Sequence, residues 1–131
     1  MRQNYQNSLQ EIMEYIYLLE QNMLMIELKN KPKNVHANKY GIYKQTSSVI
    51  NDKPSWVNGE CAIWFSKTQE WMIGDKCNLG TNTCGITSTI ADVQSPALIG
   101  NNWEYIKNGQ WIEAQPGDIS VINIKGRHKI A

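Results

Sequence analysis

The sequence predicts a mainly β protein, α+β overall, in which an N-terminal amphipathic helix precedes a small antiparallel sheet. Asn58-Gly59 and Asn108-Gly109 each lie between short runs of aromatic and β-branched residues, and Asn-Gly in that setting is the strongest short-range signal for a tight hairpin. Further short apolar runs, separated by polar turns, fill residues 40–125. This pattern fits an open sheet, a sandwich or a partly open barrel, and the sequence leaves these three architectures open.

The first element is predicted to be a helix within residues 1–30. Ser8 and Glu11 form a capping box, which satisfies free backbone donors at a helix start. Apolar residues then recur at spacings of three and four, which is a heptad seam typical of a coiled coil. The seam consists of Leu9, Ile12, Ile16, Leu19, Met23 and Ile26.

The seam has two interpretations. It could dock on the chain's own sheet, because further apolar residues broaden the apolar face of the helix. It could also join copies of the chain in a coiled coil. The sequence favours self-association, so the six seam residues are candidate oligomerisation residues and a homo-oligomer is expected.

Residues 31–39 are polar, contain Pro32 and show no periodicity, so they are predicted to be a linker. The β domain follows over residues 40–125, and residues 126–131 form a basic tail. The first strand of the β domain is expected at Tyr40–Tyr43, and the polar stretch 46–55 is expected to end it.

Within the β domain, residues 61–65 are apolar on both faces, which predicts a central strand. Residues 71–74 should pair antiparallel with it, followed by a loop over 75–85 and a short strand over 85–90. The segment 91–102 contains Pro96 and Gly100 and predicts an irregular crossing. The second hairpin and a last strand over 119–124 complete the domain.

The composition limits the classes of function. The chain of 131 residues has a net charge of +1, which argues against nucleic-acid binding driven by electrostatics. Its longest apolar runs are too short for a membrane span. The polar N-terminus lacks the apolar segment of a signal peptide, so we expect an intracellular, cytoplasmic protein, or an extracellular one if the sequence is a fragment of a secreted protein.

The residues that usually carry catalysis are scattered. His36 falls in the predicted linker and His128 in the tail, where neither would be held rigidly. The three cysteines lack a zinc-binding spacing; Cys77 and Cys84 could bridge, although reduced thiols are favoured. We therefore predict no enzyme activity, no catalytic residues, no metal and no cofactor. An enzyme would need a cleft that gathers Glu60, Glu70 or Asp75 with Cys61 or a tyrosine.

Tryptophan is the only residue type with binding chemistry that is concentrated in one part of the chain, since all five tryptophans lie between Trp56 and Trp111. Core packing is favoured for Trp64, Trp71 and Trp103, because a domain with one phenylalanine needs large side chains. Trp56 and Trp111 flank the hairpin turns and could be exposed. Exposed rings would stack on sugars, so the candidate ligand platform is Trp56, Trp111, Tyr105, Asn101, Asn102 and Glu104.

Residues 40–113 carry a recurring order of motifs: Tyr40-x-x-Tyr43, Asn58-Gly59, Ile63-Trp64-Phe65, Trp71-x-Ile73-Gly74, a glycine-containing loop, Pro96 and Trp103. This order resembles a small tryptophan-rich β domain that recurs in uncharacterised proteins of protists and marine invertebrates. The resemblance implies a non-catalytic module and supplies no active-site residues. The sequence thus predicts a structural or protein-interaction module that self-associates through its helix and presents a surface to an unknown protein partner. The alternative is a carbohydrate-binding module.

Overall fold

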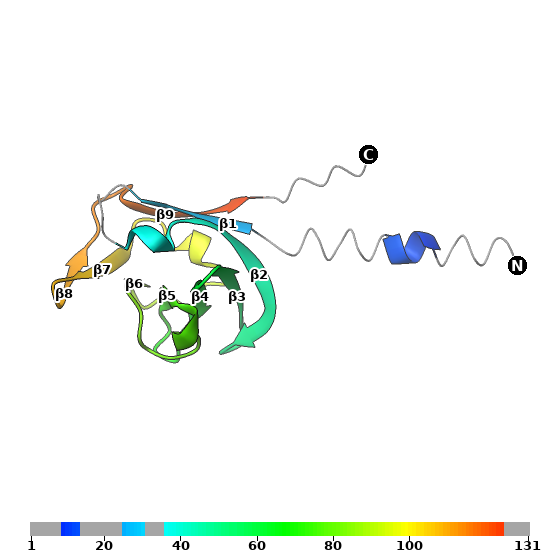
Figure 1. Cartoon of the computed structure of the whole chain (residues 1–131), viewed down its shortest axis with the longest axis horizontal. Coiled ribbons are helices and arrows are strands. Elements are labelled where there is room, and N and C mark those ends of the chain that lie inside the picture. Colours follow the sequence, from blue (N-terminus) through cyan, green and yellow to red (C-terminus); the bar gives the residue numbers. More distant parts are fainter. Residues whose placement is uncertain (1–8, 14–24, 31–35, 125–131) are drawn as a thin grey trace, which may run out of the picture.

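A computed structural model describes residues 9–13, 25–30 and 36–124 (Figure 1), and their strands form one antiparallel sheet that curls into a half-barrel. The nine strands lie in the order β8-β7-β6-β5-β4-β3-β2-β1-β9. Mainly β structure is confirmed, and of the three architectures left open the partly open barrel is the one observed. The strands are β1 (Met25–Asn30), β2 (Gly41–Ile50), β3 (Lys53–Asn58), β4 (Cys61–Phe65), β5 (Trp71–Asp75), β6 (Ile86–Ser88), β7 (Trp103–Lys107), β8 (Gln110–Glu113) and β9 (Ile119–Ile124).

Both Asn-Gly dipeptides form hairpins, as predicted, but with different turns. Asn108 and Gly109 both have positive φ, at 52° and 76°, as a type I′ turn requires. In the β3–β4 hairpin, Asn58 pairs with Cys61, so the two central residues are Gly59 and Glu60. Only Gly59 has positive φ there, at 56°, which is the φ pattern of a type II′ turn.

A third tight hairpin joins β2 to β3, inside the polar stretch 46–55 that was expected to end the first strand. Asn51 and Asp52 have φ of 52° and 67°, and Ile50 pairs with Lys53 across them. Asn and Asp tolerate positive φ because their short polar side chains bond locally. The turn therefore needs no glycine, and strand β2 runs to Ile50 rather than ending near Tyr43.

Strand β4 is central, as its apolar run predicted, and is buried on both faces. On the concave inner face, Cys61, Ile63 and Phe65 belong to the main core. On the outer face, Ala62 and Trp64 pack with Met72 under Leu79 and Cys84. The Trp64 indole N–H donates to the Thr81 carbonyl at 2.9 Å. The loop after β5, which begins with the 3-10 helix η2 (Lys76–Asn78), thus folds back over the outer face.

The predicted helix over residues 1–30 is wrong at its C-terminal end, because residues 25–30 form strand β1. This strand lies between β2 and β9 and pairs antiparallel with both. Ile26 and Leu28 are buried in the core, and they alternate with Glu27 and Lys29 in the period-two pattern of a strand. The last seam residue is therefore core and not part of a coiled coil.

The helix of the described residues covers only positions 9–13. Leu9, Ile12 and Met13 are exposed on it. The remaining seam positions, Ile16, Leu19 and Met23, lie outside the described residues, as does the basic tail. Among the residues that the structure describes, no helix combines the length and apolarity needed to cross a membrane.

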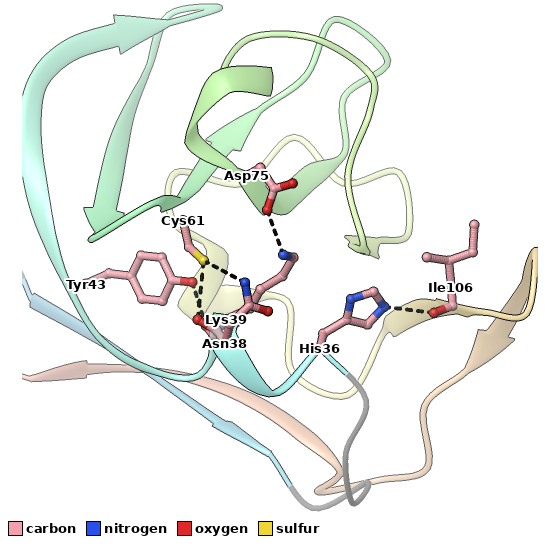
Figure 2. A network of polar contacts seen from close by, with 7 residues as sticks. All are labelled: His36, Asn38, Lys39, Tyr43, Cys61, Asp75 and Ile106. Atoms are coloured by element: carbon pink, nitrogen blue, oxygen red, sulfur yellow. Dashed lines mark hydrogen bonds and ion pairs between the residues drawn. The ribbon is translucent and has the colours of Figure 1, made fainter.

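The predicted linker over residues 31–39 is also corrected at its end. Residues 37–39 form the 3-10 helix η1 (Ala37–Lys39), which follows His36 in a left-handed conformation, with φ of 52°. Lys39 is buried, and His36 Nε2 lies 2.8 Å from the Ile106 carbonyl oxygen. These residues are built into the rim of the half-barrel at the end where β4 begins and β5 ends (Figure 2).

Candidate binding site

The outer face carries a polar pocket around Trp111, which we call the Trp111 pocket. Its volume is about 300 Å³. It contains one indole, two carboxylates, two hydroxyls and one amide beside a thioether and a thiol. The lining residues are Thr68, Glu70, Met72, Asn82, Cys84, Thr87, Glu104 and Trp111.

The sheet register places these side chains together. Met72 pairs with Thr87, Thr87 with Glu104, and Glu104 with Glu113 across four neighbouring strands. Paired residues point to the same face of a sheet, so this row lies on the outer face. Trp111 is two residues before Glu113 on β8 and shares that face.

Hydrogen bonds hold the Glu70 carboxylate at the pocket wall. The Thr68 hydroxyl donates to its Oε1 at 2.6 Å, and the Thr87 hydroxyl lies 3.4 Å from its Oε2. Trp111 is 46% exposed, although a large aromatic side chain gains stability from burial. The pocket therefore presents an open aromatic ring beside positioned hydrogen-bonding groups.

A second pocket, the rim pocket, lies where η1 meets the ends of β5, β6 and β7. Its volume is about 280 Å³, and it is lined by His36, Lys39, Asp75, Asn78, Thr83, Cys84, Gly85 and Ile106. Lys39 Nζ is 3.0 Å from Asp75 Oδ1; the lysine side chain is 8% exposed and the aspartate side chain 57%. Figure 2 shows this ion pair beside the His36–Ile106 contact.

The η1 segment is anchored to the core by a small polar network (Figure 2). The Tyr43 hydroxyl donates to the Lys39 carbonyl at 2.5 Å, and the Cys61 thiol donates to the Asn38 carbonyl at 3.3 Å. Burial, followed by the neighbouring Cys61, raises the pKa of Tyr43 above its ordinary value. The phenol therefore stays protonated, and so remains a donor, to higher pH than an ordinary tyrosine.

Gly85 allows His36 to lie against the sheet. A Cβ at this position would come within 2.6 Å of His36 Cε1 and 2.8 Å of His36 Nδ1. The backbone of Gly85 is otherwise ordinary, so the requirement is for space. The histidine that the sequence placed in a loose linker thus packs against Gly85, just before β6, and contacts the Ile106 carbonyl on β7.

Cys84 lines both pockets. Burial, followed by the negative charge of Glu70, raises the pKa of its thiol to about 11. Cys61, Cys77 and Cys84 are all free thiols. The bridge between Cys77 and Cys84 that the sequence left open is therefore not formed, and Cys84 acts as a neutral side chain in a shared wall.

The structure brings together two of the predicted platform residues, Glu104 and Trp111. Trp56 is only 1% exposed and packs against Trp71 inside the barrel, so its place in the platform is wrong. Tyr105 packs against the inner core, because it pairs with Ile86 on the opposite face from Glu104. Asn101 and Asn102 are exposed in the turn before β7 and do not line the pocket.

Sequence reasoning missed Thr87, Asn82 and Cys84 as site residues. Glu70 and Asp75 had been named as alternative acids for a catalytic cleft, and they line different pockets. The period-two alternation of strands β6 to β8 could have identified Thr87. Asn82 and Cys84 lie in the loop after β5, which reaches the pocket because it packs over Trp64. This packing is tertiary and has no local sequence signal.

No protein-family model matches the chain, and neither the curated proteins nor the solved structures contain a match. The resemblance to a recurring tryptophan-rich domain therefore stays a prediction. Within residues 9–13, 25–30 and 36–124, no three His, Cys, Asp or Glu side chains gather in a way that could hold a metal ion. The geometry of the two pockets carries the functional argument.

Proposed function

We propose that this chain is a non-catalytic binding module whose Trp111 pocket takes a carbohydrate. The observation that carries the proposal is the exposed Trp111 ring in a pocket that Glu70, Glu104, Asn82 and Thr87 also line. An indole face suits the C–H face of a sugar ring, while carboxylates, amides and hydroxyls bond its hydroxyl groups.

The position of Glu70 supports this assignment. Its carboxylate accepts a 2.6 Å hydrogen bond from the Thr68 hydroxyl, so less side-chain entropy is lost when a ligand hydroxyl donates to it. Hydrogen bonds to an ionised carboxylate are also stronger than those between neutral groups. Such a site recognises a polar, uncharged ligand with several donor groups, which describes a neutral sugar.

Self-association through the helix has less support. Ile26, the last residue of the predicted seam, is buried between β2 and β9, so the seam is shorter than the sequence indicates. The exposed side chains of Leu9, Ile12 and Met13 leave a homo-oligomer, or a contact with an unknown protein partner, as a prediction. Mass measured in solution over a range of concentrations tests it.

Intrinsic fluorescence offers a direct test of sugar binding. Four of the five tryptophans are at most 1% exposed, so quenching by a soluble agent reports chiefly on Trp111. A panel of neutral oligosaccharides is titrated into the protein, with acrylamide quenching and calorimetry as readouts. We expect at least one oligosaccharide to bind, with protection of Trp111 from acrylamide.

Two variants give the test its specificity. Trp111→Ala should weaken binding at least tenfold, on the order of 1.4 kcal/mol. Val49→Ala is the matched control, because Val49 is an exposed apolar residue outside the pocket, and it should bind like the wild type. A panel with no binder, or equal affinity in the Trp111 variant, would refute the proposal.

A further inference from the structure

We infer that the rim pocket is a second sugar subsite that continues the Trp111 pocket, so that the ligand is a neutral oligosaccharide rather than a single sugar. This inference rests on the proposed function. Its physical basis is that Cys84 forms a wall of both pockets. Two pockets with a common wall can be occupied by successive units of one chain.

The sizes of the pockets support a ligand that spans both. Their volumes are about 300 Å³ and 280 Å³, each at or just below the lower end of the range for small-molecule sites, roughly 300 to 1,000 Å³. Either pocket alone therefore suits a small unit, and only the two together match a larger ligand. The similar volumes also fit a ligand made of repeated units.

The rim pocket is a built polar site. Lys39 is almost fully buried and holds one oxygen of Asp75, whose side chain remains more than half exposed. Asn78 and Thr83 line the same pocket from the loop that covers Trp64. A carboxylate, an amide and a hydroxyl can thus bond a second sugar unit, and the lysine fixes the position of the carboxylate.

Charge selects the class of saccharide. Glu70 and Glu104 line the Trp111 pocket without a lysine or arginine among its lining residues, so a sugar acid would meet like charge there. In the rim pocket the charges of Lys39 and Asp75 cancel as an ion pair. Both subsites therefore favour a neutral chain over an acidic one.

The two subsites contribute differently to affinity. The Trp111 ring supplies stacking, whereas the rim pocket supplies hydrogen bonds whose net energies are small in water. The sugar unit in the Trp111 pocket should therefore bind weakly on its own. The unit in the rim pocket should add to the affinity, without substituting for the unit in the Trp111 pocket. Affinity should rise with chain length until both pockets are filled.

The test measures affinity as a function of chain length. The monosaccharide, disaccharide, trisaccharide and tetrasaccharide of one neutral sugar that binds are titrated into the full chain and followed by NMR of the backbone amides. We expect affinity to rise at least tenfold from one unit to four. The monosaccharide should shift amides around Trp111, and the tetrasaccharide should also shift those of Asn78 and Thr83.

Variants separate this inference from the proposed function. Asn78→Ala with Thr83→Ala should remove the gain with length and leave monosaccharide binding unchanged. Asn101→Ala is the control, because Asn101 is exposed outside both pockets. Equal affinity for all lengths, or an unchanged length dependence in the double variant, overturns the second subsite but not the first. An acidic oligomer that binds more tightly overturns the charge argument, and binding by no saccharide overturns both proposals.

Discussion

Trp71 and Trp111 occupy opposite faces of the same curled sheet and have opposite environments. Trp71 is fully buried on the inner face, with its ring centroid 5.8 Å from that of Trp56 and 5.2 Å from that of Phe65. Trp111 lies on the outer face and is 46% exposed. The returning loop covers the outer face at Trp64 and Met72, and it leaves the Trp111 pocket open. The same residue type thus lies in the core or at the surface according to what covers its strand.

The largest expected effect is on stability, from truncation of the inner tryptophan. Trp71→Ala should cost about 3–5 kcal/mol in the free energy of unfolding, since it also removes the indole bond to the Val93 carbonyl at 3.2 Å. Trp111→Ala should cost less than about 1 kcal/mol. Urea unfolding followed by circular dichroism measures both, and similar losses would break the distinction between the two faces.

The next effect concerns the packing of η1 on the rim. Gly85→Ala should destabilise the fold by about 1–3 kcal/mol, because the new Cβ would overlap the His36 ring. The same substitution should cost much less in a His36→Ala background. A double-mutant cycle in urea measures the coupling, and additive costs would show that His36 is not held against Gly85.

Alkaline pH should act on the buried phenols of the inner face and the rim. Burial raises the pKa of Tyr40 to about 12, and it also raises that of Tyr43. Between pH 10 and 12 the unfolded chain releases phenol protons that the folded chain keeps, so stability falls as the pH rises. Urea unfolding at pH 8 to 11 should show this fall.

Variants isolate the contribution of the phenols from those of other groups that titrate at high pH. Tyr40→Phe and Tyr43→Phe should each flatten the dependence of stability on pH relative to the wild type. A dependence as steep in both variants as in the wild type would contradict the role of burial. Spectrophotometric titration of the tyrosines checks the same point, because the two buried phenols should ionise last.

The smallest effect is a difference in thiol reactivity at the outer face. Cys77 is exposed, whereas the pKa of Cys84 is raised to about 11. Below pH 9 its thiolate fraction is therefore roughly a hundredfold below that of an unshifted thiol, partly offset by higher intrinsic nucleophilicity. Alkylation at pH 8, followed by peptide mass spectrometry, should modify Cys77 first, and Glu70→Gln should accelerate Cys84. Equal alkylation rates for the two thiols would contradict the burial of Cys84 between the two pockets.

Local signals in the sequence predicted most of the sheet. The Asn-Gly turns, the doubly apolar strand 61–65 and the final strand 119–124 each depend on neighbouring residues, and each is confirmed. The error at residues 25–30 has a physical cause. Ile26 and Leu28 suit a strand or a helix face, and long-range pairing with β9 decides between them.

The candidate site was predictable only in part. Trp111 was singled out because it flanks a hairpin turn that the sequence reveals, and Glu104 was named as a polar group beside it. The assignment of Trp56 failed because closeness to a turn does not determine which face of a curled sheet a residue occupies. His36 and Cys84 depend on contacts with Ile106 and the loop over Trp64, and such contacts have no local sequence signal.

The pairing of β1 with β9 has a consequence for how the chain folds. Every other pair in the described sheet joins strands that follow one another along the chain, whereas β1 and β9 are brought together from nearly opposite ends of it (Figure 1). Contacts between distant residues form slowly, because a long loop must close first. During synthesis, the hairpins from β2 to β8 can therefore assemble as they emerge from the ribosome. Until β9 arrives, β1 presents an open edge, and this interval is when a nascent chain is most exposed to mispairing with another.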